Sequence, residues 1–187
     1  TNTIYEFDFA LESFTNCGNG PGIACTPVWP ASLYGASAAV AGNLIYVVGG
    51  TPTGSTTAAT NTFGYFDTSN YTVTSGLPVY PLNRMSPAVT VSGNKFFAMG
   101  GSSNATNCSG TNYNCTNNYF YTLGGSWSAA LTNIPYGFTN GASALYGDSI
   151  YIFGGTSDGT NGITALSEYS ITGDSWPNCG SSCGNLS

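Results

Sequence analysis

The stretch GNLIYVVGG at residues 42–50 returns as GNKFFAMGG at residues 93–101 and as GDSIYIFGG at residues 147–155. Each copy opens with a Gly-Asn or Gly-Asp turn and closes with a double glycine. Most residues between the turn and the glycines are apolar, including neighbours whose side chains would point to opposite faces of a strand. This pattern predicts a strand that is buried on both faces. Such a strand must lie between sheets that pack face to face.

The copies start at Gly42, Gly93 and Gly147, so they stand 51 and 54 residues apart. This period is typical of propellers and similar arrays rather than of helical solenoids. Around each copy stand three further short runs, for example PAVTVSG before the second copy and YFYTLGG and SWSAALTNIP after it. Together they predict a four-stranded antiparallel meander in each repeat.

The double glycines are predicted to let the backbone turn sharply and to leave room where neighbouring sheets crowd together. No phosphate-binding pattern accompanies them, because neither GxGxxG nor GK[ST] is present. The six residues concerned are Gly49, Gly50, Gly100, Gly101, Gly154 and Gly155.

The chain is expected to form a single domain over residues 1–187. Its start, TIYEFDFALESFTNC, contains SFTNC, which matches SWPNC at residues 175–179 and predicts the last two strands of a blade. The domain then divides into a half blade and loop at 1–33, unit 1 at 34–82, unit 2 at 83–136 and unit 3 at 137–187. That gives about three and a half blades, whereas closed propellers have about four to eight. Either the chain belongs to a longer propeller or its incomplete end blades join other copies.

With these features the sequence resembles the kelch-repeat family. The resemblance rests on the three nine-residue copies, on the turn YFDTSN at residues 65–70, on Trp127 and Trp176, and on Arg84, which stands where kelch units often carry arginine. Arginine occurs here in one unit only, and Tyr71 is interpreted as the replacement for Trp in unit 1. The resemblance implies an all-β, kelch-like β-propeller of four-stranded antiparallel blades, usually a binding or scaffolding platform and occasionally the frame of an oxidase.

The composition excludes several classes of partner. Only 5% of the residues are charged, two are basic and eight acidic, and the net charge is −6. This balance repels phosphate backbones and anionic lipid, so no nucleic-acid partner is expected. No run of 18 apolar residues occurs, so no membrane insertion is expected either.

Covalent sugar is the expected substitute for the missing charge. Asn-X-Ser/Thr acceptors for N-glycans occur at Asn70, Asn104, Asn107, Asn114 and Asn185, and none has Pro in the middle position. Three of them fall between residues 104 and 114, in a segment that also reads as a loop. Because Ser, Thr and Asn are abundant, chance is the alternative explanation for some of these acceptors.

The six cysteines form three close pairs, which predicts local disulfides and an oxidising, extracellular compartment. Zinc is not expected, because the sequence has no His and the cysteine spacings do not repeat as CxxC. The predicted pairs are Cys17 with Cys25, Cys108 with Cys115, and Cys179 with Cys183.

Catalysis is not expected, and neither is a cofactor or a metal ion. The absence of His removes Ser-His-Asp and Cys-His systems and the copper site of the kelch-framed oxidases. Paired carboxylates of glycosidases and a calcium loop at Asp158 stay as weaker alternatives. The acidic residues are Glu6, Asp8, Glu12, Asp67, Asp148, Asp158, Glu168 and Asp174.

The sequence therefore predicts a secreted, N-glycosylated structural protein whose partners are copies of itself in an extracellular fibril or surface layer. The alternative is an extracellular carbohydrate- or protein-binding kelch module from a larger propeller, with a glycan or protein ligand. In that case loop aromatics would stack on sugar rings. The candidate loop aromatics are Trp29, Tyr34, Tyr113 and Tyr136.

Overall fold

The computed structural model describes residues 4–15, 29–104, 108, 114–158, 160–164 and 166–177, and over these residues the chain is all-β. Apart from one short 3-10 helix, η1 (Thr56–Ala58), every regular element is a strand. The strands are β1 (Glu6–Asp8), β2 (Ser13–Thr15), β3 (Ser37–Ala41), β4 (Leu44–Val48), β5 (Phe63–Asp67), β6 (Thr72–Thr74), β7 (Ala88–Ser92), β8 (Lys95–Met99), β9 (Asn118–Thr122), β10 (Ala142–Tyr146), β11 (Ser149–Phe153) and β12 (Leu166–Ser170).

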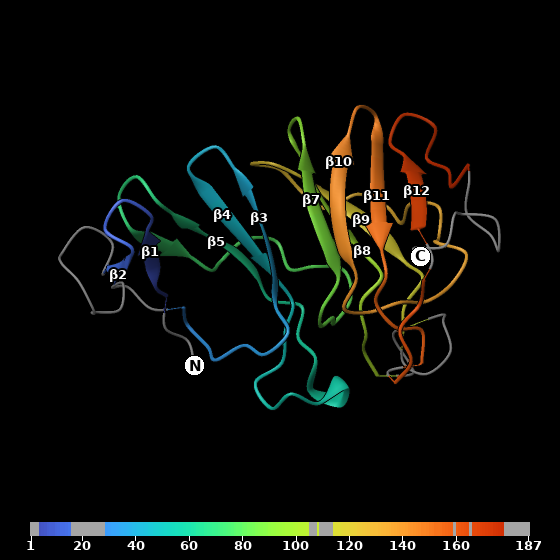
Figure 1. The fold of residues 1–187 in the computed structure, drawn as a ribbon, viewed down its shortest axis with the longest axis horizontal. Helices are drawn as coiled ribbons and strands as arrows, with labels where there is room; N and C mark the ends of the chain where they lie inside the picture. Colours follow the sequence, from blue (N-terminus) through green and yellow to red (C-terminus); the bar gives the residue numbers. More distant parts are fainter. Residues whose placement is uncertain are drawn as a thin grey trace.

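These strands form four separate antiparallel sheets, one for each predicted unit and one for the half blade. β1 and β2 make a two-stranded hairpin, and unit 1 contains the complete order β3-β4-β5-β6. Unit 2 has β7-β8-β9 and unit 3 has β10-β11-β12. Figure 1 shows the sheets following one another in sequence order, with the hairpin at one end and β10–β12 at the other.

The Gly-Asn and Gly-Asp dipeptides make the predicted tight turns between the first two strands of each unit. β3 ends at Ala41 and β4 begins at Leu44, so Gly42 and Asn43 alone connect them. Gly42, Gly93 and Gly147 have φ values of 59°, 56° and 60°, which is the left-handed region that glycine enters at little cost. The repeated turn thus fixes the same register in all three units.

The unit sheets pack face to face, as the two-sided apolar strands predict. Tyr46, Val48 and Phe63 of unit 1 share one buried cluster with Phe96 and Tyr121 of unit 2. The opposite face of the unit 2 sheet is buried as well, in a second cluster that joins Phe97 and Met99 to Ile150, Ile152 and Tyr169 of unit 3. The middle sheet therefore supplies both cores, which explains why β8 is apolar on both faces.

The predicted fourth strands of units 2 and 3 are reduced to short bridges. In unit 2 the only bridge of this strand among the described residues joins Tyr121 to Trp127, although Ser128 N–H still donates to the Phe120 carbonyl. There Phe120 N–H donates to the Ser128 hydroxyl instead of to a backbone carbonyl, so the regular ladder ends. In unit 3 the only counterpart among the described residues is the Ser170–Ser175 bridge.

The register also corrects one assignment made from the sequence. Trp127 pairs with Tyr121 at the end of β9, whereas the equivalent pair in unit 1 joins Phe66 to Val73. Val73 and not Tyr71 therefore occupies the tryptophan position of unit 1. Tyr71 lies two residues earlier, in the turn between β5 and β6, where its φ is 57°.

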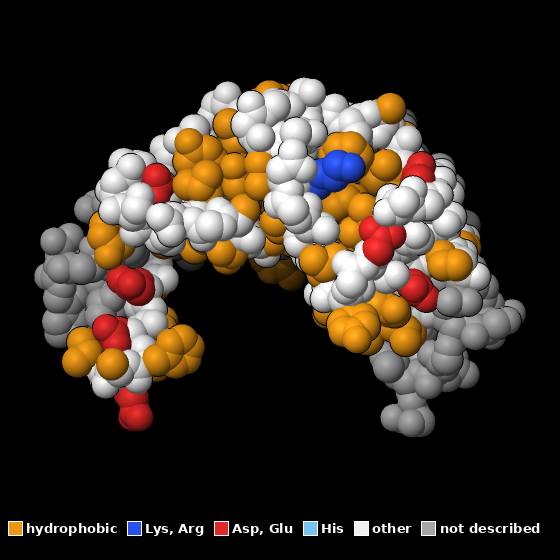
Figure 2. Space-filling model, turned by 90° about the horizontal axis from the view of Figure 1, so that it is seen from above, with side chains coloured by type: hydrophobic (Ala, Val, Ile, Leu, Met, Phe, Trp, Pro, Cys, Tyr) orange, Lys and Arg blue, Asp and Glu red, His pale blue; other side chains and the backbone are white. Residues whose placement is uncertain are grey.

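The described sheets do not close into a ring. Figure 2 shows an arch with a hollow between its two arms. The prediction of antiparallel sheets stacked in an array is thus confirmed, while the number of blades in a closed propeller is not established. No helix in the described ranges is long and apolar enough to cross a membrane.

Candidate assembly surfaces and modification sites

The hairpin at one end of the arch presents an uncovered aromatic face. Phe7 lies opposite Phe14 across the two strands, and their rings meet edge to face at 5.2 Å. Tyr5 extends the same face, and its ring lies 6.1 Å from that of Phe14. Phe7 is 43% exposed and Phe14 is 56% exposed, although aromatic side chains of this size are normally buried.

The turn of the hairpin enlarges this apolar surface. Phe9 is 88% exposed and its ring contacts Phe7 at 5.4 Å, and Leu11 is exposed beside it. Alternation places the acidic residues Glu6 and Asp8 on the opposite face of the two strands. The sequence analysis did not predict this surface, although the alternation of aromatic and acidic residues in YEFDF indicates it.

The other end of the arch has an open sheet face on unit 3. β11 alternates, so that Ile150 and Ile152 are buried against unit 2 while Tyr151 and Phe153 point to the other side and stay partly exposed. Tyr146 of β10 lies on this side too and is 80% exposed. Figure 2 shows hydrophobic side chains on both arms of the arch.

The open face of unit 3 also carries a carboxylate. Glu168 lies directly opposite Tyr151 across the sheet. The Ser149 hydroxyl donates a hydrogen bond of 2.7 Å to Glu168 Oε1. The Glu168 carboxylate is thereby held by a neighbouring residue of the same sheet, and the aromatic rings of the face stay available for contact.

The predicted glycosylation sites differ in their accessibility. Asn70 is exposed in the turn between β5 and β6, where its side-chain oxygen accepts hydrogen bonds from the Thr72 amide and hydroxyl. Asn104 is partly exposed. Asn107 and Asn185 lie outside the described residues.

Asn114 has a different environment from Asn70 and Asn104. It is only 2% exposed, and its side-chain amide donates a hydrogen bond of 3.1 Å to the Thr156 carbonyl of unit 3. A glycan attached to that nitrogen requires the side chain to leave this site. The glycosylation assignments as a group stay predictions.

One of the three predicted disulfides lies in the described part of the chain and is present. Cys108 and Cys115 are bonded, with their Cα atoms 4.6 Å apart. Cys115 is fully buried, so this bond anchors the loop of unit 2 against the core. The other two pairs, Cys17 with Cys25 and Cys179 with Cys183, fall outside the described residues.

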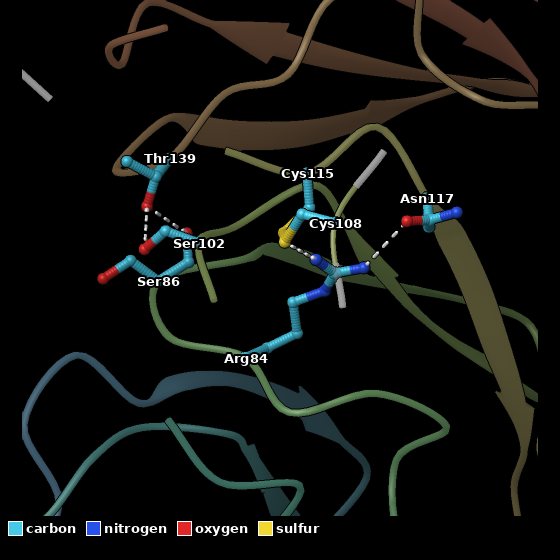
Figure 3. The surroundings of a disulfide bond; sticks show 7 residues. All are labelled: Arg84, Ser86, Ser102, Cys108, Cys115, Asn117 and Thr139. Atoms are coloured by element: carbon cyan, nitrogen blue, oxygen red, sulfur yellow. Dashed lines mark hydrogen bonds between the residues drawn. A yellow bond between two sulfur atoms is a disulfide. The ribbon is translucent and has the colours of Figure 1, made fainter. Parts of the chain in front are cut away.

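Arg84 lies beneath this disulfide and is fully buried (Figure 3). One guanidinium nitrogen, Nη1, donates to Cys108 Sγ at 2.9 Å and the other, Nη2, donates to Asn117 Oδ1 at 3.3 Å. No acceptor among the described residues contacts Nε. Since Arg84 N–H also bonds to the Thr60 carbonyl of unit 1, this residue ties the unit 2 loop to the preceding unit.

The first glycine of the pair lies close to the next unit in units 1 and 2, at Gly49 and Gly100. Gly49, Gly100 and Gly154 have φ values of 68°, 60° and 60°, and their successors Gly50, Gly101 and Gly155 have values of 97°, 88° and 87°. A Cβ atom on Gly49 would lie 2.4 Å from the Arg84 carbonyl oxygen of unit 2. Glycine is therefore required both by the backbone conformation and by the neighbouring unit.

The aspartates serve in turns. Hydrogen bonds from Ser69 hold the pKa of Asp67 below its ordinary value. Hydrogen bonds from Asn161 and Thr160 hold the pKa of Asp158 well below its usual range. Asp148 receives the amide and hydroxyl of Thr172. Each of these carboxylates satisfies local backbone and side-chain donors, as expected for turn residues.

No group of three or more potential metal ligands occurs in the described ranges. Asp174 lies close to Tyr169, whose hydroxyl donates to it at 2.7 Å. Burial, and secondarily this carboxylate, raise the pKa of Tyr169 far above its ordinary value. Asp174 also accepts the Thr132 amide of unit 2, so it supports the junction between the two units.

The described loop aromatics that were candidates for sugar stacking differ in their exposure. Trp29 is 6% exposed and packs over Gly64 on the sheet of unit 1, so it is a core residue and cannot stack on a sugar in solvent. Tyr136 is partly buried and its hydroxyl forms a hydrogen bond with the Ser167 hydroxyl. Tyr34 is 65% exposed, while Tyr113 lies outside the described residues.

No model of a protein family matches the chain, and a search of curated proteins finds no match either.

Proposed function

We propose that this chain is an extracellular, N-glycosylated structural protein that assembles with copies of itself into a fibril or surface layer through the two open ends of its arch. Its sheets are in this proposal the blades of a kelch-like propeller. The observation that carries it is the pair of uncovered apolar sheet faces, on the β1–β2 hairpin and on β10–β12. Exposed apolar faces of this kind mark sites where another protein surface binds.

The composition supports the same proposal. With 5% charged residues and 14% aromatic residues, the chain has few groups that would keep an isolated particle dispersed in water. The exposed sequon at Asn70 lies in a turn where an attached glycan has room. The Cys108–Cys115 bond fits a compartment in which disulfides persist. Localisation, glycosylation and polymer formation are all part of the proposal.

A second candidate is an extracellular carbohydrate- or protein-binding kelch module. The exposed ring of Tyr34, which is 65% accessible, favours this candidate because a flat aromatic surface can stack on a sugar ring. The Tyr34→Ala variant should then lose retention on a glycan array, with Val79→Ala as the matched change at another exposed position. Equal retention of both variants would remove the support for this candidate.

Electron microscopy of the native, unfractionated material tests the structural proposal. Filaments or sheets with a regular repeat that can accommodate one copy of this chain are the expected result. Mass measurement of the same preparation should find the chain with attached N-glycans. Isolated particles of monomer mass at the concentration found in the native material would overturn the proposal.

A further inference from the structure

The two internal junctions between units are built in the same way. The forward face of a unit sheet is the face that contacts the next unit. The rear face is the face that contacts the preceding unit. At the first junction Tyr46 on the forward face of unit 1 lies 6.4 Å from Tyr121 on the rear face of unit 2, measured between ring centroids. At the second junction Phe97 lies 6.4 Å from Tyr169.

At both junctions the rear face carries a second aromatic residue beside the first. Trp127 neighbours Tyr121 and donates its indole N–H to the Pro78 carbonyl of unit 1 at 2.9 Å. Trp176 neighbours Tyr169, with ring centroids 5.0 Å apart, and donates to the Thr132 carbonyl of unit 2 at 3.0 Å. The rear faces of units 2 and 3 thus each present an aromatic pair, from the third and fourth strand positions, to the unit before them.

Strand pairing shows that the hairpin presents a rear face. Phe7 pairs with Phe14 as Phe66 pairs with Val73 and as Tyr121 pairs with Trp127. The opposite side of the hairpin takes the forward position, because Ile4 packs against Phe66 on the rear face of unit 1. Phe7 and Phe14 are therefore equivalent to the aromatic pairs of units 2 and 3, but no unit precedes them in the described structure.

Unit 3 presents the complementary surface. Tyr151 occupies the position of Tyr46 and Phe97 in the nine-residue repeat, and those two are 4% and 1% exposed because a following unit covers them. No described element covers the side of the sheet that carries Tyr151 and Phe153. The molecule thus has one free forward face and one free rear face of a contact that it already makes twice.

The backbone of unit 3 also has the hydrogen-bond donor that the other units use at their junctions, the N–H of the second glycine. Gly50 N–H donates to the Arg84 carbonyl of the next unit at 2.7 Å, and Gly101 N–H donates to the Phe138 carbonyl at 2.8 Å. No acceptor in the described part of the chain takes the equivalent N–H of Gly155. A following unit would supply that carbonyl as well as the covering side chains.

We propose that the rear face of the hairpin in one copy seats on the forward face of unit 3 in a second copy, with Phe7 and Phe14 over Tyr151 and Phe153. This contact has the same form as the two junctions between units within the chain. A second copy of the chain is therefore the partner that fits the free faces. The contact is heterologous, and it generates either an open chain of copies or a closed ring. The inference rests on the proposed self-assembly and names the surfaces that carry it.

The charges are compatible with this contact. The acidic side chains of the hairpin strands, Glu6 and Asp8, lie on the opposite side from Phe7 and Phe14. The carboxylate on the receiving face is that of Glu168, which already accepts a hydrogen bond from Ser149. The acidic residues of the two hairpin strands therefore do not face the Glu168 carboxylate across the contact.

Photo-crosslinking tests the contact directly. Tyr151 is replaced by benzoylphenylalanine, copies labelled with ¹⁵N and ¹⁴N are mixed and assembled, and the irradiated material is digested and analysed by mass spectrometry. The expected result is a crosslink of mixed isotopic composition between residue 151 and the segment 4–15. Benzoylphenylalanine at Tyr34, which is exposed but lies on neither face, is the control and should give no such product.

The outcomes separate this inference from the proposed function. Assembled material whose crosslinks from residue 151 lead to another segment, or stay within one copy, overturns the contact and leaves self-assembly standing. Wild-type protein that does not assemble overturns both. A closed ring of few copies with the expected crosslink supports the contact and overturns the fibril or layer.

A pair of variants adds a quantitative test. Phe7→Ser with Phe14→Ser should raise the critical concentration for assembly by about tenfold or more, because two aromatic side chains would then leave the contact. Val79→Ser, at a 59% exposed position outside both faces, should leave it unchanged. Far-ultraviolet circular dichroism checks that the variants keep the fold. Folded double variants that assemble like wild type would overturn the inference.

Discussion

At the scale of single residues, the structure depends on glycines that have two different functions. Gly93 makes a hairpin turn in open space, where a Cβ would meet no atom within 4 Å beyond its own chain neighbours. Gly100, only seven residues later, has almost the same φ, 60° against 56°. A Cβ on Gly100, however, would lie 2.4 Å from Cε1 of Phe138. Glycine is therefore required by the backbone alone at Gly93, and by both the backbone and packing at Gly100.

This pair gives a controlled prediction. Gly93→Ala should lower the free energy of unfolding by about 1–2 kcal/mol, the cost of a left-handed alanine. Gly100→Ala should cost about 1–3 kcal/mol more, because the methyl group must displace a buried ring. Urea denaturation of the two variants beside wild type measures both losses. Equal losses would show that Phe138 does not constrain Gly100.

At the scale of elements, the sequence was sufficient to predict the strands that repeat. The nine-residue copies gave β4, β8 and β11, and the alternating runs around them gave the first and third strands of each unit. These predictions succeeded because turn chemistry and two-sided burial are encoded locally. The fourth strands predicted for units 2 and 3 are present only as bridges. In unit 2 the Ser128 hydroxyl replaces a ladder carbonyl as the acceptor, and this depends on the rotamer of its side chain.

The candidate sites were less predictable for a physical reason. Trp29 reads as a loop residue, yet it covers Gly64, which lies 35 residues away. Asn114 reads as an exposed sequon, yet it bonds to Thr156 in the next unit. Both outcomes depend on contacts between distant segments, which no local pattern records. The local cysteine pair Cys108–Cys115, by contrast, was predicted correctly, because closing a short loop has a low entropic cost.

The disulfide supports a prediction at this scale. Changing Cys108 and Cys115 together to Ser should lower the free energy of unfolding by about 2–4 kcal/mol, since the bond restrains the unfolded chain. The change also removes the sulfur that accepts from Arg84 Nη1. Chemical denaturation followed by tryptophan fluorescence measures the loss. A loss no larger than that of the surface change Val79→Ser would contradict an anchoring role for this bond.

At the scale of the whole molecule, the arch combines an interior stacked like a repeat array with an exterior that has very few charges. The net charge of −6 comes from two basic and eight acidic side chains. Arg84, one of the two basic residues, is fully buried and contributes nothing to solvation. The exterior therefore relies on uncharged polar groups. In the proposed function, N-glycans supply the remaining hydration and keep the assembled particles apart.

Enzymatic removal of N-glycans from the assembled native material tests this role of the sugars. Because so little charge is left on the surface, deglycosylated particles should associate side by side and sediment at low speed, while mock-treated particles stay dispersed. Light scattering follows the change, and peptide mass spectrometry identifies the sites released. Glycan is expected on the exposed Asn70 and not on Asn114, whose amide is used inside the fold. Particles that stay dispersed after complete release would show that the polar protein surface alone is sufficient, and a glycan found on Asn114 would show that the contact with Thr156 does not form in the native protein.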